Sequence, residues 1–156
     1  MTKKPEIPKE EDVILRKDGL YYVKDAKISF TGSSEDFFEN SQLKSRGNYR
    51  DGKLHGLYVL FYENGQLKFK GNYKYGKEYG LYEWYHKNGQ LHSKQKYEKG
   101  QIIDGQHEWF FDNGKLKYRE TFKNGKQHGL SEWFDENGKF IQTMILRNGQ
   151  TIDIKS

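Results

Sequence analysis

The chain has 156 residues, with 27 Lys and Arg, 22 Asp and Glu, and no cysteine. This length suits a single domain, and the lack of cysteine excludes both a disulfide framework and a thiolate metal site. Only 33% of the residues are hydrophobic although 16% are aromatic, which favours a thin β-sheet covered by large rings over a thick two-layer core.

Residues 1–12 are predicted to form a flexible tail or tether, because Pro5, Pro8 and mixed charges give no apolar pattern. The segment has no apolar stretch of the kind found in secretory signal peptides. Two interpretations of localisation stay open. As the sequence stands the protein is expected to be cytoplasmic, whereas removal of an upstream signal or lipid anchor would make it surface-tethered or periplasmic.

A single folded domain is predicted over residues 13–156, beginning with an N-terminal cap at 13–31. Two short apolar runs, at 13–15 and 20–23, flank the dipeptide Asp18-Gly19. Asp-Gly between such runs predicts a β-hairpin. Residues 24–31 then connect this cap to the rest of the domain.

From residue 32 the sequence repeats itself. Glycine opens five copies at spacings of 24, 24, 25 and 24 residues, at Gly32, Gly56, Gly80, Gly105 and Gly129. A fixed period of this size indicates a repeat array. In each of the last four copies an Asn-Gly pair, such as Asn64-Gly65, separates two runs rich in aromatic and β-branched residues. We therefore predict an all-β fold: an elongated, twisted antiparallel meander of repeated β-hairpins, each closed by a two-residue type I′ turn with φ > 0 at both residues.

That turn also predicts which residues lie opposite each other, and opposite partners share a face of the sheet. On one face, charged pairs result: Glu35 with Arg46, Glu83 with Lys94, and Glu108 with Arg119. The same face places Phe61 beside Lys68 and Phe110 beside Lys117, where a ring can lie under an ammonium group. The other face is apolar, with Tyr58 opposite Gly71 so that a ring packs over bare backbone.

The last copy differs from the others. Its second strand carries Phe140, Ile141 and further apolar residues, followed by Ile152 and Ile154. Residues 140–156 are predicted to be an apolar C-terminal cap that closes or covers the edge of the sheet.

By its repeated residues the chain resembles the bacterial variant of the MORN repeat, whose pattern is YxxGKxxGxWxxYxxNGxLxxxxxY. One copy shows it as Tyr73, Gly76, Lys77, Gly80, Trp84, Tyr85, Asn88, Gly89 and Leu91. The resemblance covers roughly residues 30–150 and implies an elongated meander of hairpins. Bacterial proteins of this kind are often named as antitoxin or immunity proteins, others sit on cell surfaces, and eukaryotic relatives are scaffolds, sometimes associated with membranes.

The residues show no catalytic arrangement, so we expect no enzyme, cofactor or metal. His55 and His128 precede an opening glycine and fit a role in turns. The run from His107 to Phe111 is not the HExxH zinc motif, and a strand would not present that helical face. No Ser lies in a GxSxG context, and no P-loop is present.

A non-catalytic protein-interaction or scaffold module remains the best prediction, with an antitoxin or immunity-type protein that binds a toxin as its finer form. Tyr and Trp are favoured at interface hot spots. The partner-binding candidates are Tyr58, Tyr82, Trp84, Trp109 and Trp133. The alternatives are a surface-tethered, lipoprotein-like adhesion or envelope protein, or a binder of anionic lipid or single-stranded nucleic acid through a basic stripe. That stripe consists of Lys68, Lys70, Lys94, Lys117 and Arg119.

Overall fold

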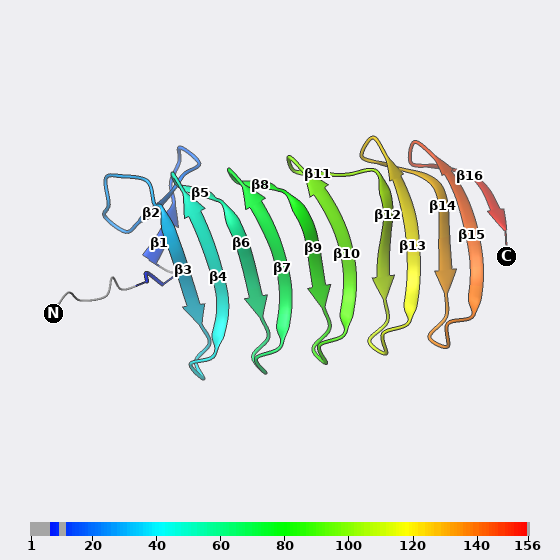
Figure 1. Ribbon diagram of the computed structural model, residues 1–156, viewed down its shortest axis with the longest axis horizontal. Coiled ribbons are helices and arrows are strands. Elements are labelled where there is room, and N and C mark those ends of the chain that lie inside the picture. Colours follow the sequence, from blue (N-terminus) through cyan, green and yellow to red (C-terminus); the bar gives the residue numbers. More distant parts are fainter. Residues whose placement is uncertain (1–6, 10–11, 156) are drawn as a thin grey trace.

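The computed structural model describes residues 7–9 and 12–155, so most of the predicted tail at 1–12 lies outside the described residues. Within that part, the chain is nearly all β-structure and forms no α-helix (Figure 1). The strands are β1 (Val13–Leu15), β2 (Tyr21–Val23), β3 (Gly32–Phe37), β4 (Leu43–Arg50), β5 (Lys53–Leu54), β6 (Gly56–Phe61), β7 (Leu67–Lys74), β8 (Lys77–Glu78), β9 (Gly80–Tyr85), β10 (Leu91–Glu98), β11 (Gln101–Ile102), β12 (Gly105–Phe110), β13 (Leu116–Lys123), β14 (Lys126–Phe134), β15 (Phe140–Arg147) and β16 (Gln150–Lys155).

Strands β3 to β16 form one open, antiparallel sheet of 14 strands. Chain neighbours are also neighbours in space, in the order β16-β15-β14-β13-β12-β10-β9-β7-β6-β4-β3, and the short β5, β8 and β11 pair with β4, β7 and β10. Figure 1 shows the sheet as an elongated single layer whose hairpins follow one another from the N-terminal to the C-terminal end. The predicted meander of repeated hairpins is confirmed.

The loops at the Asn-Gly pairs are not type I′ turns, and here the prediction is wrong. Gly65 has a φ of +79°, whereas Asn64 is not among the described residues with positive φ. The Tyr62 amide donates to Gln66 O (2.8 Å), and the Gly65 amide donates to Tyr62 O (2.9 Å). These bonds define a three-residue loop, a type I turn followed by a left-handed glycine. The register consequently shifts by one residue, and Phe61 pairs with Leu67.

Type I′ turns instead connect one repeat to the next, at the opposite ends of the strands (upper side in Figure 1). At Tyr75-Gly76, for example, the two φ angles are 51° and 79°. Both positions being positive is the signature of this turn. The same pair of positive φ angles occurs at Asp51-Gly52, Lys99-Gly100, Asn124-Gly125 and Asn148-Gly149.

The regular recurrence of asparagine in the repeats has a different structural cause. The side-chain nitrogen of Asn64 donates to Lys87 O in the next loop (2.9 Å), and that of Asn88 donates to Asp112 O (2.6 Å). Asn113 continues the series by donating to Glu136 O (2.8 Å). We call this series the asparagine ladder. These hydrogen bonds connect successive loops. The asparagine therefore recurs for its side-chain donor and not for a left-handed backbone conformation.

One face of the sheet is rich in large rings, and we call it the aromatic face; it carries Tyr58, Tyr82, Trp84, Trp109 and Trp133. Tyr82 and Phe69 are 3% and 6% exposed although no second sheet covers them within the described residues. Tyr58 pairs with Gly71, as predicted. The ring over Gly71, however, belongs to Tyr82 of the next hairpin, and Tyr58 packs over Gly47. Rings thus fill the space above glycines of the preceding repeat.

The two ends of the sheet differ. At the first end, the hairpin β1–β2 and its connection pack on the aromatic face, where Tyr21 and Phe30 lie 5.1 and 5.4 Å from the ring of Tyr49. The β3 edge is also met by residues 7–9, since the Glu35 amide donates to Pro8 O (3.1 Å). At the other end, β16 is the edge strand, and Ile152 and Ile154 are 54% and 58% exposed.

Candidate interaction surface

A transverse row of large side chains crosses the aromatic face, and we call it the ring row. Each member faces the next in the strand register, because directly opposed residues share a face. The row runs through Leu60, Phe69, Trp84, Ser93, Trp109, Tyr118 and Trp133.

The far part of the ring row is a stack of three rings. Trp109 and Tyr118 lie 4.3 Å apart between centroids and are nearly parallel, at 8°. Trp133 continues the stack 6.3 Å from Tyr118 at 13°. All three side chains are half-buried, so they pack on one another and still present surface to solvent. Such stacking adds to the burial of area in holding the rings in place.

The ring row is interrupted at Ser93, which is 3% exposed and lies between Trp84 and Trp109. An open hollow of about 240 Å³ adjoins it and is lined by Trp84, His92, Ser93, Gln95 and Trp109. His92 reaches this hollow because it is the extra residue of a bulge, where the register jumps from Leu91 to Ser93. We call this feature the Ser93 hollow.

A second hollow, of about 280 Å³, lies over the second and third hairpins and is lined by Tyr58, Leu60, Phe69, Tyr73, Glu78, Tyr82, Trp84 and Tyr97. Tyr82 forms its floor and donates its hydroxyl to Asn72 O (2.9 Å). Burial is the main cause that raises the pKa of Tyr82. Its ring therefore belongs to the packing of the layer.

The opposite face, which we call the charged face, carries a row in which acids and bases alternate: Lys70, Glu83, Lys94, Glu108, Arg119 and Glu132. The predicted opposition of Glu83 to Lys94 and of Glu108 to Arg119 is confirmed. In this row the close ion pairs nevertheless form between repeats: Lys70–Glu83 at 2.7 Å, Lys94–Glu108 at 3.2 Å and Arg119–Glu132 at 2.5 Å. In the first hairpin, Glu35 and Arg46 lie opposite each other as predicted and form an ion pair at 2.5 Å. The hydrogen bond to Glu83 is the main cause that raises the pKa of Lys70.

The predicted contacts of Lys68 and Lys117 are wrong by one residue. Both are the extra residues of bulges and have no partner in the register. Lys68 Nζ lies 5.6 Å from the ring centre of Tyr62, and Lys117 Nζ lies 5.5 Å from that of Phe111. The rings predicted for these contacts were Phe61 and Phe110. The predicted basic stripe is thus divided between bulges and a row in which carboxylates alternate with the cations.

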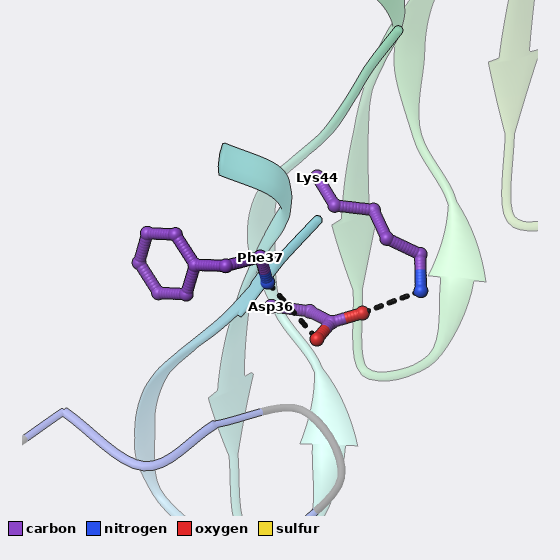
Figure 2. Close-up of polar contacts among 3 residues, drawn as sticks. All are labelled: Asp36, Phe37 and Lys44. Carbon is purple, nitrogen blue, oxygen red and sulfur yellow. Dashed lines mark hydrogen bonds and ion pairs between the residues drawn. The ribbon is translucent and has the colours of Figure 1, made fainter. Parts of the chain in front are cut away.

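The first hairpin places an ion pair at its bulge. Lys44 Nζ lies 2.6 Å from Asp36 Oδ2, and the Phe37 amide donates to the other carboxylate oxygen at 2.9 Å (Figure 2). The Phe37 ring points away from this pair and is 45% exposed. The Asp36 carboxylate therefore neutralises the bulge cation.

Comparison with known families decides what these hairpins are. The family model described as a MORN repeat variant matches residues 30–51, 54–75, 78–102, 103–124 and 127–144. The chain belongs to the MORN repeat variant family. The MORN matches cover the strands from β3 to most of β15, so both faces described above are built from MORN hairpins.

Other comparisons add little to the MORN assignment. A chain in a crystal structure of accessory secretory protein 1,2 and 3 in Streptococcus pneumoniae is similar at 18% identity and a TM-score of 0.39. The match covers 66% of this chain and 19% of that chain. A search of the curated proteins finds no match. The MORN hairpins themselves make the chain a repeat-based interaction module.

The MORN hairpins bring three of the five predicted candidates together in the ring row and place the other two, Tyr58 and Tyr82, one row away. Trp84, Trp109 and Trp133 share the ring row and are half-buried, as is Tyr58, which lies one row away, whereas Tyr82 is buried. Sequence reasoning missed Ser93, Gln95, His92 and Tyr118. The sequence contained a signal for this hollow. The repeat position that carries Phe69 in one copy and Tyr118 in another carries the small Ser93 in the copy between them.

The buried titratable side chains of the MORN hairpins have hydrogen-bond partners within the fold. In the part of the chain that the structure describes, no three His, Cys, Asp or Glu side chains gather to hold a metal ion. His107 is 2% exposed, with Nε2 3.1 Å from Ile103 O, and burial lowers its pKa. Burial raises the pKa of Glu120, which accepts a hydrogen bond from Gln127. Within the part of the chain that the structure describes, no helix is long and apolar enough to span a bilayer.

Proposed function

We propose that this MORN chain is a non-catalytic module that binds another protein through its aromatic face. The observation that carries the proposal is the ring row, in which Trp84, Trp109 and Trp133 present half-exposed rings on one side of an open sheet. Exposed apolar patches of this kind mark interaction surfaces. Tryptophan and tyrosine are also the residues that contribute most at the centre of protein interfaces.

The charged face supports a protein partner over an anionic polymer or lipid. A nucleic-acid site needs cations that are free to neutralise phosphates. Here Lys70, Lys94 and Arg119 each lie within 3.2 Å of a carboxylate oxygen. Their charge is therefore largely compensated inside the protein, although the chain as a whole carries +5.

The resemblance to bacterial MORN proteins extends the proposal to an antitoxin or immunity-type role, in which the partner is a toxin. The alternative is a surface-tethered, lipoprotein-like protein whose aromatic face contacts an envelope protein. Both roles use the same surface and no catalysis. They differ in the identity of the captured partner and in what that partner does when it is expressed alone.

The test is capture from an extract of the source cell on the immobilised full chain, at about 0.3 M salt, where long-range electrostatic attraction is screened. The aromatic-face variant is Trp84→Gln with Trp133→Gln. The matched control on the charged face is Lys94→Gln with Glu108→Gln, which leaves the net charge unchanged. Each variant is first compared with the wild type by circular dichroism and thermal unfolding.

We expect a protein that is captured by the wild type and the control but lost with the aromatic-face variant. Recovery of nucleic acid alone, vanishing at the higher salt, would overturn the proposal, as would equal loss in both variants. Growth arrest on expressing the captured protein alone, relieved by co-expression of this chain, would support the immunity role. A captured envelope protein without toxicity would favour the surface-tethered role.

A further inference from the structure

One part of the ring row is a stack of three rings, and this stack indicates what the Ser93 hollow can hold. Trp109, Tyr118 and Trp133 are consecutive in the row and form a stack with interplanar angles of 8° and 13°. Trp84, Ser93 and Trp109 are consecutive in the same row one repeat earlier. The middle member is a tyrosine ring in one triplet and a hydroxymethyl group in the other.

The backbone spacing is the same in the two triplets. Adjacent strands lie about 4.8 Å apart, so residues two strands apart are separated by about 9.6 Å. This separation applies to Trp84 and Trp109 as it does to Trp109 and Trp133, because each pair flanks one intervening strand. In the second triplet Tyr118 occupies that space. In the first, no ring stands at the middle position: Ser93 is buried, with His92 Nδ1 3.2 Å from its Oγ, and the open hollow of about 240 Å³ lies beside it, lined by Trp84 and Trp109.

Besides the two tryptophans, the hollow is lined by the polar residues His92, Ser93 and Gln95, and none of its lining residues carries a carboxylate. The ring nitrogen Nδ1 of His92 lies 3.2 Å from Ser93 Oγ. Gln95 Oε1 accepts a hydrogen bond from the Tyr97 hydroxyl (2.9 Å), and within the described chain the Gln95 side-chain nitrogen has no hydrogen-bond partner. Burial, followed by the charges of His86 and Lys117, lowers the pKa of His92 and so disfavours its cationic form. Because no carboxylate lines the hollow, a ligand cation would find no counter-ion among its lining residues.

We propose that the Ser93 hollow receives a neutral planar ring that carries a hydrogen-bonding group, namely a tyrosine side chain of the protein partner. The ring would lie between Trp84 and Trp109, as Tyr118 lies between Trp109 and Trp133. This inference rests on the proposed protein-binding function and names the chemical group that the surface recognises. A nucleobase is disfavoured because the cations Lys70, Lys94 and Arg119 lie on the opposite face.

The first experiment probes the wild-type chain alone. N-acetyl-L-tyrosinamide is titrated while the three indole N–H signals are followed by ¹⁵N NMR, with N-acetyl-L-leucinamide and N-acetyl-L-argininamide as controls. A single small ring is expected to bind with a Kd on the order of millimolar. We expect the tyrosine probe to shift the signals of Trp84 and Trp109 more than that of Trp133, and more than either control does. No shift, a uniform shift, or a stronger response to the arginine probe would overturn the inference.

The second experiment fills the hollow. Ser93→Tyr supplies the missing ring from the chain itself, and Ser93→Ala leaves the hollow open as a matched control. We expect Ser93→Tyr to abolish both the probe response and partner capture while its melting temperature stays equal or rises, and Ser93→Ala to keep both. The wild-type titration remains decisive if Ser93→Tyr does not fold.

These outcomes separate the inference from the proposed function. Partner capture by folded Ser93→Tyr at the wild-type level would overturn the inference and leave the proposed function intact. Failure of the wild type to capture any protein would overturn the proposed function, whatever the probe titration shows. Loss of capture in Ser93→Tyr together with its retention in Ser93→Ala would support both.

Discussion

Replacing Gly71 by alanine tests whether the rings of one repeat are seated on the backbone of the preceding one. A Cβ atom at Gly71 would lie 2.7 Å from Tyr82 Cε1 and 2.8 Å from Phe69 Cζ. Both rings are buried, at 3% and 6% exposure, so neither can move aside without displacing its neighbours. Gly71 does not have a positive φ, so the alanine is not strained by the backbone itself.

Gly71→Ala is expected to lower stability, whereas replacing glycine by alanine within a strand usually raises it. Glycine within a strand is usually less stable than alanine by about 0.5–1 kcal/mol. Overpacking in a close-packed region instead costs about 1–3 kcal/mol. For a domain of this size each kcal/mol lowers the melting temperature by about 2–4 °C. Thermal unfolding followed by circular dichroism should therefore show Gly71→Ala melting about 2–12 °C below the wild type.

Two comparisons make this test specific. At Gly47 the closest contacts of an added Cβ are looser, at 3.0 to 3.2 Å from Tyr49 and Tyr58, so Gly47→Ala should cost less. Tyr82→Ser removes the main obstructing ring, so the cost of Gly71→Ala should shrink in that background, as a double-mutant cycle would show. Wild-type melting of Gly71→Ala, or an equal loss in both backgrounds, would refute the proposed seating of Tyr82.

Three further predictions concern the ladder, the backbone and a buried acid. Asn88→Asp keeps the acceptor for the Gln90 amide but removes the donor to Asp112 O, so chemical denaturation should show a loss of about 0.5–1.5 kcal/mol in the free energy of unfolding. The control Asn137→Asp, in the last hairpin, should cost less, and equal costs would contradict the asparagine ladder. Gly80→Ala meets no atom within 4 Å, but its φ of +83° should still lower stability, by about 1–2 kcal/mol, and a gain in melting temperature would contradict this. Burial raises the pKa of Glu120 above its ordinary 4.5, so the wild type should lose stability as pH rises from below 4.5 through that raised pKa. Glu120→Gln should remove this loss and melt higher at neutral pH, and identical pH profiles of melting temperature would show that Glu120 is not the cause.

The sequence by itself determined the repeat, the hairpins and the order of the strands. A period of 24 or 25 residues with one Asn-Gly pair per copy leaves little choice but a meander, because consecutive hairpins pair with their chain neighbours. The two faces also followed from the sequence, since side chains alternate along a strand. The opposition of Glu83 to Lys94 was predicted correctly for this reason. The three candidate tryptophans were likewise placed on one face by alternation alone.

Contacts between repeats were decided only by the tertiary structure. Asn64 looked suited to a left-handed turn, but its side chain bonds to Lys87 O in the next hairpin, and a three-residue loop makes that reach possible. Glu83 faces cations on both sides, and the register did not say that it would pair with Lys70 rather than Lys94. The Ser93 hollow arises in the same way. Its walls come from two different hairpins, and a small residue leaves a hollow only when its neighbours in space, 9 and 16 residues away in the chain, are both large rings.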